Sequence, residues 1–299
     1  MRIGFPPRTR REFLAGLAGS ALAPLEARTG MYNPQLAAQT RIWLPLQQDP
    51  EAVFAGIRQA GYRRVDLMPE FLQPARRDET LRLVRAYQLE IAAACAAGSR
   101  DQVMETARVA RDGNARFLAV AAAAGARPSD ADLEARAYQL NQLGGDVGRL
   151  GLRLLLQHGP EEMRDNARSW RFLAGHTETA LVSLCLDAGC ASMAGIDPSG
   201  LLEESASRLA SVYLRSRRGG VPLEEVGDGD PDMARIAATL RRISYDGLLV
   251  VDLESDPQSR RQPLPMALSH TRWYMQEIFG TRPGARPVDM GPHVRTQRF

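Results

Sequence analysis

The sequence predicts a single α/β domain built as a closed (β/α)8 barrel. Eight apolar, strand-like segments alternate with eight helix-like segments along the 299-residue chain, and a barrel of this type typically needs about 250 residues. The clearest strand lies in Leu181–Cys190, LVSLCLDAGC, where an apolar run without helical periodicity is followed by turn residues. Such a run is typical of a strand buried on both faces. Asp187 then stands at its carboxyl end, where barrel enzymes carry out catalysis.

The remaining elements are expected in regular alternation. The other expected strands are Arg41–Leu46, Arg64–Met68, Ile91–Ala96, Phe117–Ala121, Gly151–Leu156, Leu209–Leu214 and Leu248–Asp252. The expected helices are Asp49–Ala60, Glu79–Leu89, Arg100–Asp112, Asp130–Leu150, Glu162–Ala174, Pro198–Ser207, Pro231–Ile243 and Leu264–Phe279. The first helix illustrates how the sequence marks helix ends. Asp49 can cap it, Pro50 suits its first turn and Gly61 ends it.

An open, doubly wound sheet is the alternative arrangement of alternating strands and helices. That fold normally carries a glycine-rich phosphate-binding loop after its first strand. The corresponding residues here are Leu46-Gln47-Gln48-Asp49, which include no glycine. The barrel is therefore the preferred prediction.

The composition excludes several kinds of chemistry. The sequence contains no lysine, so all 38 of its basic residues are arginines. Schiff-base aldolases and pyridoxal phosphate enzymes both need a lysine amine, so both classes are excluded. The net charge is only +3, and no basic run is interleaved with aromatic residues. Nucleic acid is therefore not an expected partner.

The three cysteines are Cys95, Cys185 and Cys190. They form no CxxC pair, which argues against a thiolate zinc site. Buried free thiols are the preferred interpretation, with a disulfide as the alternative.

The amino-terminal residues predict an export signal. Thr9-Arg10-Arg11-Glu12-Phe13-Leu14 matches the twin-arginine pattern Ser/Thr-Arg-Arg-x-Phe-Leu, and a weakly apolar run, Ala15–Leu25, follows it. That run is shorter than the roughly 20 residues of a membrane span and fits the apolar region of a signal peptide. A basic, disordered tail is the alternative.

These features divide the chain into three parts. We expect a signal peptide at residues 1–30, the barrel at 40–280 and a disordered tail, rich in Pro, Gly and Arg, at 281–299. The predicted location is the periplasm or another exported site, and no membrane span is expected in the mature chain.

Acidic and polar side chains follow several of the expected strands. They are Asp66, Glu70, Gln157, His158, Glu161, Glu162, Asp187, Cys190, Tyr213, Arg215, Asp252 and Glu254. The carboxyl ends of barrel strands meet at one mouth, so these carboxylates would repel one another unless a cation or a shared proton offset them. Mg²⁺ and Mn²⁺ prefer such oxygen ligands. For any single acid, the alternative is a solvated loop charge or a helix cap.

Three segments of the chain match patterns that occur together in one family of barrels. Arg208–Asp232, RLASVYLRSRRGGVPLEEVGDGDPD, is similar to the family's seventh strand and a loop ending Gly-Asp/Glu-Gly-Asp-x-Asp. Gly247–Glu254, GLLVVDLE, resembles the closing strand, which normally ends Val-Val-Glu. Gly151–Met163 aligns without gaps to Gly-Leu-x-Leu-x-Tyr-His-Asn-His-x-x-Glu-Phe/Met. Together these segments resemble the xylose isomerase-like sugar phosphate isomerase/epimerase family of TIM barrels. The resemblance covers Thr40–Phe279 and implies the same barrel.

The resemblance also implies a divalent metal. In the family, a Glu after strand five, an Asp after six, a His on seven and a Glu on eight bind the ion. By position, Glu162, Asp187 and Asp252 would hold Mn²⁺ or Mg²⁺, and Glu162 and Asp252 would also move the proton. Asp252 is one methylene shorter than the family's Glu. Tyr213 stands in place of the His, and a neutral tyrosine is a poor ligand for a divalent ion.

The same comparison assigns the substrate contacts. Arg215 would contact an anionic or hydroxylated group of the substrate. His158 is what remains of His-Asn-His and is either a substitute metal ligand or an ordinary hydrogen-bonding residue. Cys190 replaces a His that usually contacts substrate, and Tyr213 is a candidate proton donor.

Two hypotheses about function follow. The first is an exported sugar isomerase or epimerase that acts on a small carbohydrate by metal-assisted proton transfer next to a carbonyl, and we prefer it. The second is a metal-free, catalytically impaired relative that binds a carbohydrate or serves as a partner subunit, which the changes at Gly159, Cys190 and Tyr213 favour. An endonuclease with three metal ions is weaker, because it needs more ligands than the four histidines of this chain supply. A homo-oligomer is compatible with each hypothesis.

Overall fold

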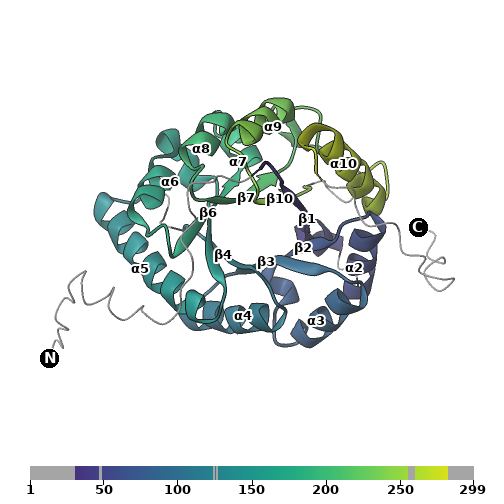
Figure 1. The fold of residues 1–299 in the computed structure, drawn as a ribbon, viewed down its shortest axis with the longest axis horizontal. Coiled ribbons are helices and arrows are strands. Elements are labelled where there is room, and N and C mark those ends of the chain that lie inside the picture. Colours follow the sequence, from purple (N-terminus) through teal and green to yellow (C-terminus); the bar gives the residue numbers. More distant parts are fainter. Residues whose placement is uncertain (1–30, 47–48, 124, 126, 255–259, 282–299) are drawn as a thin grey trace.

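Parallel strands close into a barrel in the computed structural model, and helices surround it (Figure 1). The structure describes residues 31–46, 49–123, 125, 127–254 and 260–281. Around the barrel the strands follow the order β1-β10-β7-β6-β5-β4-β3-β2, and each pairs in parallel with its neighbours. The predicted (β/α)8 barrel is therefore confirmed.

The elements alternate along the chain as the sequence predicts. The barrel strands are β1 (Gln35–Gln39), β2 (Arg64–Leu67), β3 (Glu90–Ala96), β4 (Phe117–Ala121), β5 (Arg153–Gln157), β6 (Val182–Asp187), β7 (Leu209–Leu214) and β10 (Leu248–Val251). The α-helices are α2 (Pro50–Gln59), α3 (Arg77–Ala86), α4 (Arg100–Asp112), α5 (Asp130–Arg149), α6 (Arg164–His176), α7 (Ala188–Met193), α8 (Pro198–Glu204), α9 (Met233–Arg242) and α10 (Leu264–Phe279).

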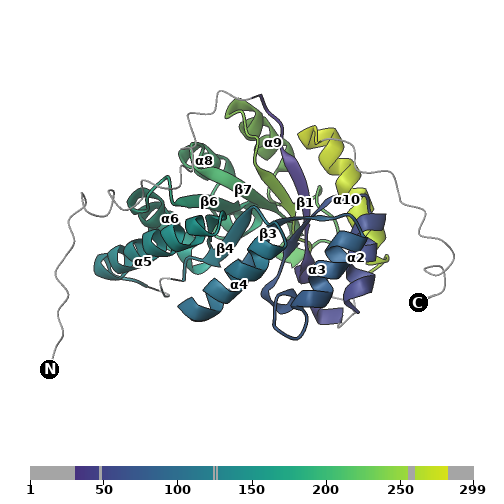
Figure 2. The same ribbon diagram turned by 60° about the horizontal axis from the view of Figure 1, so that its bottom comes forward.

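Shorter elements shape the loops at the carboxyl ends of the strands. Three 3-10 helices, η1 (Thr40–Leu46), η2 (Pro69–Phe71) and η3 (Glu161–Met163), follow β1, β2 and β5. A small antiparallel hairpin, β8 (Arg217–Arg218) and β9 (Val221–Pro222), follows β7. Figure 2 shows α3, α4 and α5 lying along the outer face of the barrel.

Two hydrophobic cores hold the barrel together. The larger core lies between the strands and the helices and includes Phe54, Trp170 and Phe279. The smaller core fills the inside of the barrel, where small residues such as Ala93 and Cys185 pack around larger ones such as Phe117 and Tyr213. Successive side chains of a strand point to opposite faces, so residues alternate between the two cores. The inside of the barrel is therefore filled with side chains rather than open.

The strand register brings particular interior residues together. On the closing side of the barrel, Ala37 lies opposite Val250, and Val250 lies opposite Tyr213. Tyr213 in turn lies opposite Asp187 of β6. Asp187 and Tyr213 are thus neighbours on adjacent strands, close to the carboxyl end of the barrel.

The predicted first strand, Arg41–Leu46, is wrong. The strand that closes the barrel is Gln35–Gln39, and Thr40–Leu46 forms a 3-10 helix. Two physical features explain the difference. Pro45 lacks the N–H group that a ladder needs, and Ile42 and Trp43 are instead buried in the outer core. The barrel therefore begins at Gln35, five residues before the predicted start at residue 40.

The sequence predicts a turn directly after β6, and the structure has a helix there instead. Residues Ala188–Met193 form the helix α7. The side chain of Asp187 caps this helix, because its Oδ1 accepts a hydrogen bond of 2.9 Å from the N–H of Cys190. An Asp at this position satisfies one of the free N–H groups of the first turn.

The predicted export signal at 1–30 and all but the first residue of the predicted tail at 281–299 lie outside the described residues. Among the described helices, none combines the length and the apolar character that crossing a membrane requires.

Candidate functional site

Six charged side chains gather at the carboxyl end of the barrel, and we call them the mouth cluster. They are Arg41, Asp187, Arg215, Arg217, Asp252 and Glu254. Asp187 ends β6, while Arg215 and Asp252 directly follow β7 and β10. Because side chains alternate along a strand, all three continue the interior-facing rows of their strands.

Arg215 joins two of the carboxylates in this cluster. Its Nε donates to Oδ1 of Asp187 at 3.1 Å, and its Nη2 donates to Oδ2 of the same residue. Its Nη1 donates to Oε1 of Glu254. The pair with Asp187 is a bidentate one of the kind that arginine forms best. Both partners are buried, with 8% of Arg215 and 1% of Asp187 exposed.

Gly189 makes room for the Arg215 side chain. A Cβ atom at Gly189 would lie only 2.4 Å from Cγ of Arg215. The aliphatic part of the arginine therefore packs against the main chain of α7, which fixes it in position. Arg215 is therefore a buried, packed residue of the mouth and not a surface side chain.

Asp252 is the carboxylate without a hydrogen-bond partner. It is fully buried, and neither of its oxygens accepts a hydrogen bond from any of the described residues. Its closest opposite charges are Nη1 of Arg41 at 3.6 Å and Nη2 of Arg215 at 3.7 Å. Burial raises the pKa of Asp252 above its ordinary value, and the two arginines offset this only in part.

Glu254 completes the cluster. Its Oε2 accepts from Nη2 of Arg217 at 2.5 Å, and its Oε1 lies 3.8 Å from Nη1 of Arg41. The mouth cluster thus contains three carboxylates and three guanidinium groups, so its formal charges cancel.

Glu162, predicted as a metal ligand and acid–base residue, is engaged elsewhere. Its Oε2 accepts a hydrogen bond of 2.8 Å from the N–H of Gly159, which closes the turn after β5. The residue is 5% exposed and forms no contact with Asp187 or Asp252 among the described interactions. The structure therefore does not bring the three predicted ligands together.

His158 supports the main chain of the site. Its Nε2 accepts a hydrogen bond of 2.9 Å from the N–H of Asp187, and its ring packs edge-on against Trp170 at 5.0 Å between centroids. Burial lowers the pKa of His158 to about 4, so the ring is neutral at pH 7. This contact holds the end of β6, and with it Asp187, in place.

Tyr213 lies deeper in the barrel and faces an acid on the opposite side. Its hydroxyl donates to Oδ2 of Asp66 on β2 at 2.5 Å, and Sγ of Cys95 on β3 lies 3.4 Å from Oδ1 of the same carboxylate. Burial raises the pKa of Asp66 to about 7, although both hydrogen bonds oppose that shift. Burial likewise raises the pKa of Tyr213 well above its ordinary value. Neutral Tyr213 is therefore a hydrogen-bond donor inside the barrel.

Cys190, predicted to contact substrate, is 3% exposed and is positioned by the cap that Asp187 provides. Burial raises the pKa of its thiol to about 11, so the group is neutral at pH 7. All three cysteines are free and buried, as the preferred interpretation of the sequence predicts.

Sequence reasoning missed two members of the site. Arg41 was placed inside the predicted first strand, and Arg217 was not singled out from the other arginines. A signal for Arg217 existed, because it stands two residues after Arg215 and continues the same alternation. Arg41 has a comparable signal only once β1 is placed at Gln35–Gln39, since it then follows the strand by two residues.

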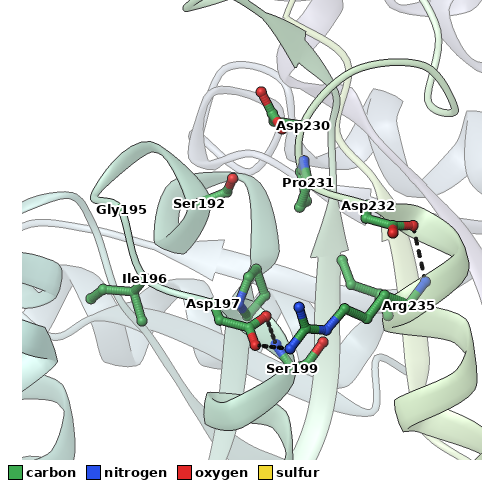
Figure 3. A pocket seen from close by; sticks show the side chains of 11 residues that line it. Ser192, Gly195, Ile196, Asp197, Ser199, Asp230, Pro231, Asp232 and Arg235 are labelled. Carbon is green, nitrogen blue, oxygen red and sulfur yellow. Dashed lines mark hydrogen bonds and ion pairs between the residues drawn. The ribbon is translucent and has the colours of Figure 1, made fainter.

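Two cavities lie outside the mouth cluster. One, of about 530 Å³, is lined by the β8–β9 hairpin, the loop after it and Tyr274 of α10. The other, of about 310 Å³, lies between α7, α8 and the start of α9 (Figure 3). Two of its three acids are engaged, since Asp197 pairs with Arg235 at 2.6 Å and Asp232 caps α9 through the N–H of Arg235. Neither cavity is lined by any of the predicted metal-binding, acid–base or substrate-contacting residues.

Comparison with known proteins places this geometry in context. No protein-family model matches the chain. The chain is 31% identical to the inosose dehydratase of Bacillus licheniformis over 153 residues, which cover 43% of this chain and 49% of that protein. The match therefore spans about half the length of this curated relative.

Two solved structures share the architecture. An L-ribulose 3-epimerase superimposes with a TM-score of 0.68 at 17% identity, covering 83% of this chain and 95% of that one. The IOLI protein with a binding zinc atom superimposes with a TM-score of 0.63 at 12% identity, covering 82% of this chain and 98% of that one. The fold is that of the xylose isomerase-like barrels.

The mouth of this xylose isomerase-like barrel does not fit a divalent cation. Among the described residues, no three His, Cys, Asp or Glu side chains are arranged to hold a metal ion. The guanidinium of Arg215 lies between Asp187 and Glu254, and Glu162 is turned toward Gly159. Tyr213 stands where the family has its ligand His, and its hydroxyl donates a hydrogen bond to Asp66. The metal site that the resemblance implies is therefore not formed by these residues.

Proposed function

We propose that the chain acts on a carbohydrate at the mouth of its barrel by moving a proton at the carbon next to a carbonyl group, as sugar isomerases and epimerases do. The similarity to an inosose dehydratase and the shared fold with an L-ribulose 3-epimerase support a carbohydrate substrate. The observation that carries the proposal is the buried carboxylate of Asp252, which has no hydrogen-bond partner among the described residues.

Asp252 is suited to act as the base. Burial raises its pKa toward the operating range of a general base, and its oxygens remain free to accept a proton. Its place directly after β10 puts it at the catalytic end of the barrel. A buried carboxylate of this kind is costly to keep unless a ligand or a reaction uses it.

The arginines are suited to stabilise the charge that this step creates. When Asp252 removes the proton, the electrons of the C–H bond form an enediolate, and negative charge develops on the former carbonyl oxygen. Arg41 and Arg215 lie 3.6 and 3.7 Å from Asp252 and can donate hydrogen bonds to an oxygen beside it. The isomerisation is completed when the hydroxyl proton of the enediolate passes to the former carbonyl oxygen and Asp252 returns its proton to the former carbonyl carbon.

A second candidate function is carbohydrate binding without turnover, as in the metal-free alternative raised by the sequence. The observation that favours it is the engagement of Glu162 with the N–H of Gly159. Epimerisation through a planar intermediate calls for acid–base groups on both faces, and this contact occupies one oxygen of the second predicted group.

Proton exchange with solvent distinguishes the two candidates. The protein is incubated in D2O with D-fructose, D-allulose, L-ribulose and an inosose, and loss of the C–H signal next to the carbonyl is followed by NMR. The proposal expects exchange with at least one of these, and a decrease of about 100-fold or more in D252N. The surface variant E134Q on α5 serves as the control for loss of a carboxylate. Thermal stabilisation by a sugar without exchange would support the binding function instead, and exchange retained in D252N would contradict the role of Asp252.

We also propose that the protein is exported through the twin-arginine pathway. The pattern Thr9-Arg10-Arg11-Glu12-Phe13-Leu14 supports this, although it lies outside the described residues. Fusion of residues 1–40 to a fluorescent reporter in a bacterium tests it. The fusion should reach the periplasm, and replacing both arginines with lysine should retain it in the cytoplasm.

A further inference from the structure

The formal charges of the mouth cluster cancel without a metal ion. Three carboxylates, Asp187, Asp252 and Glu254, face three guanidinium groups, those of Arg41, Arg215 and Arg217. Carboxylates that converge in this way need compensating positive charge. Here that charge comes from side chains, so a divalent cation would add a surplus rather than cancel a deficit.

Arg215 occupies the central place in this arrangement. Its guanidinium bonds to both oxygens of Asp187 and to Glu254, and it lies 3.7 Å from Asp252. Oδ1 of Asp187 also accepts the N–H of Cys190. A Mg²⁺ ion would need these same oxygens at about 2.0–2.1 Å, and a Mn²⁺ ion would also need them as direct ligands, so either ion and the guanidinium exclude each other.

The guanidinium retains donors for a substrate. An arginine has five N–H groups, and three of those in Arg215 donate to Asp187 and Glu254. The other two donate to no acceptor among the described residues, and so remain for a substrate oxygen at the mouth. A fixed positive charge with free N–H groups beside Asp252 can polarise a substrate carbonyl, which is the task a metal ion performs as a Lewis acid.

We propose that Arg215 replaces the divalent cation of related barrels, so that this chain binds and polarises its substrate without a metal. The proposal uses the same mouth as the proposed function, but it concerns cation binding and does not depend on which carbohydrate is bound. It also explains why a histidine is absent from β7: with no ion to bind, Tyr213 is free to pair with Asp66.

Mn²⁺ binding to the purified protein tests this proposal. Free Mn²⁺ is measured by electron paramagnetic resonance in a titration without carbohydrate, so failure of the proposed function would not affect the result. The wild type should bind no stoichiometric Mn²⁺ at millimolar concentration. R215A frees Asp187 and Glu254, and it should bind about one Mn²⁺ per chain, at least roughly tenfold more tightly than the wild type.

R217A is the matched control, because it removes the same charge from the cluster but leaves Arg215 between Asp187 and Glu254. It should remain close to the wild type. Stoichiometric Mn²⁺ binding by the wild type, or an equal gain in R215A and R217A, would overturn the proposal. If R215A does not fold, G189A provides a second route, since its Cβ displaces the Arg215 side chain. A folded G189A should also gain Mn²⁺ affinity, and an unchanged affinity together with displaced Arg215 would count against the proposal.

Discussion

The hydroxyl of Tyr213 on β7 donates a 2.5 Å hydrogen bond to the carboxylate of Asp66 on β2, and so joins two strands across the interior of the barrel. Both side chains are fully buried. A hydrogen bond to a charged group in such surroundings contributes more to stability than one between neutral groups. The pair therefore helps to hold the barrel closed below the mouth cluster.

Removing this hydrogen bond should destabilise the protein in a pH-dependent way. We expect Y213F to lower the free energy of unfolding by about 1–3 kcal/mol at pH 8, where Asp66 is ionised, and by less at pH 5, where it is protonated. Urea unfolding at both pH values measures the effect. Y62F is the control, because the buried Tyr62 hydroxyl donates to the neutral main-chain oxygen of Leu268 at 3.2 Å. An equal loss at both pH values in Y213F would contradict the prediction.

The buried carboxylate of Asp66 should make the protein less stable as pH rises. Its pKa is about 7 in the folded state and 3.8 as the ordinary value, so the folded state holds the proton more tightly. The contribution of this group is fully present below pH 3.8 and is lost as pH rises through 7, with a slope of up to about 1.4 kcal/mol per pH unit. D66N should remove that slope and be more stable than the wild type at pH 8. Urea unfolding from pH 4 to 8 tests this, with E134Q as the control for loss of a surface charge.

His158 should act in the opposite direction. Its pKa is about 4 in the folded state and 6.5 as the ordinary value, so the unfolded state binds the proton more tightly. Its contribution is present above pH 6.5 and is lost as pH falls toward 4, in total by about 3 kcal/mol. H158Q keeps an acceptor for the N–H of Asp187 but cannot titrate. In urea unfolding it should lose less stability than the wild type between pH 6.5 and 4, and an equal loss in the two proteins would contradict the prediction.

The sequence was sufficient for most of the fold because its signals are local. Caps and stops such as Asp49 before α2 and Gly61 after it mark helix ends within a few residues. Buried runs such as that of β6 identify strands in the same way. The first strand was misplaced because Gln35–Gln39 is short and contains two alanines, while the neighbouring Ile42-Trp43-Leu44 run has stronger strand propensity.

The site could be predicted only in part, because its contacts are not local. Alternation along a strand places Asp187 and Asp252 at the mouth without any structure. The partner of Asp187, however, is Arg215, which is 28 residues away, and the partner of Tyr213 is Asp66, which is 147 residues away. No spacing rule selects one arginine from 38. The proposed replacement of a metal ion by the guanidinium of Arg215 therefore depends on contacts that only the folded barrel shows.

Two adjacent glycines in α5 should respond oppositely to the same substitution. A Cβ at Gly144 would lie 2.7 Å from the main-chain oxygen of Leu181, at the entry to β6, whereas a Cβ at Gly145 would meet nothing within 4 Å. Alanine is the better helix former by about 0.5–1 kcal/mol, so G145A should stabilise the protein by about that amount. G144A gains the same propensity but pushes the helix away from β6, and it should be destabilised by about 1–3 kcal/mol. Urea unfolding of the two variants tests the packing of α5 on the strand that carries Asp187, and equal stabilities would show that this close approach is absent.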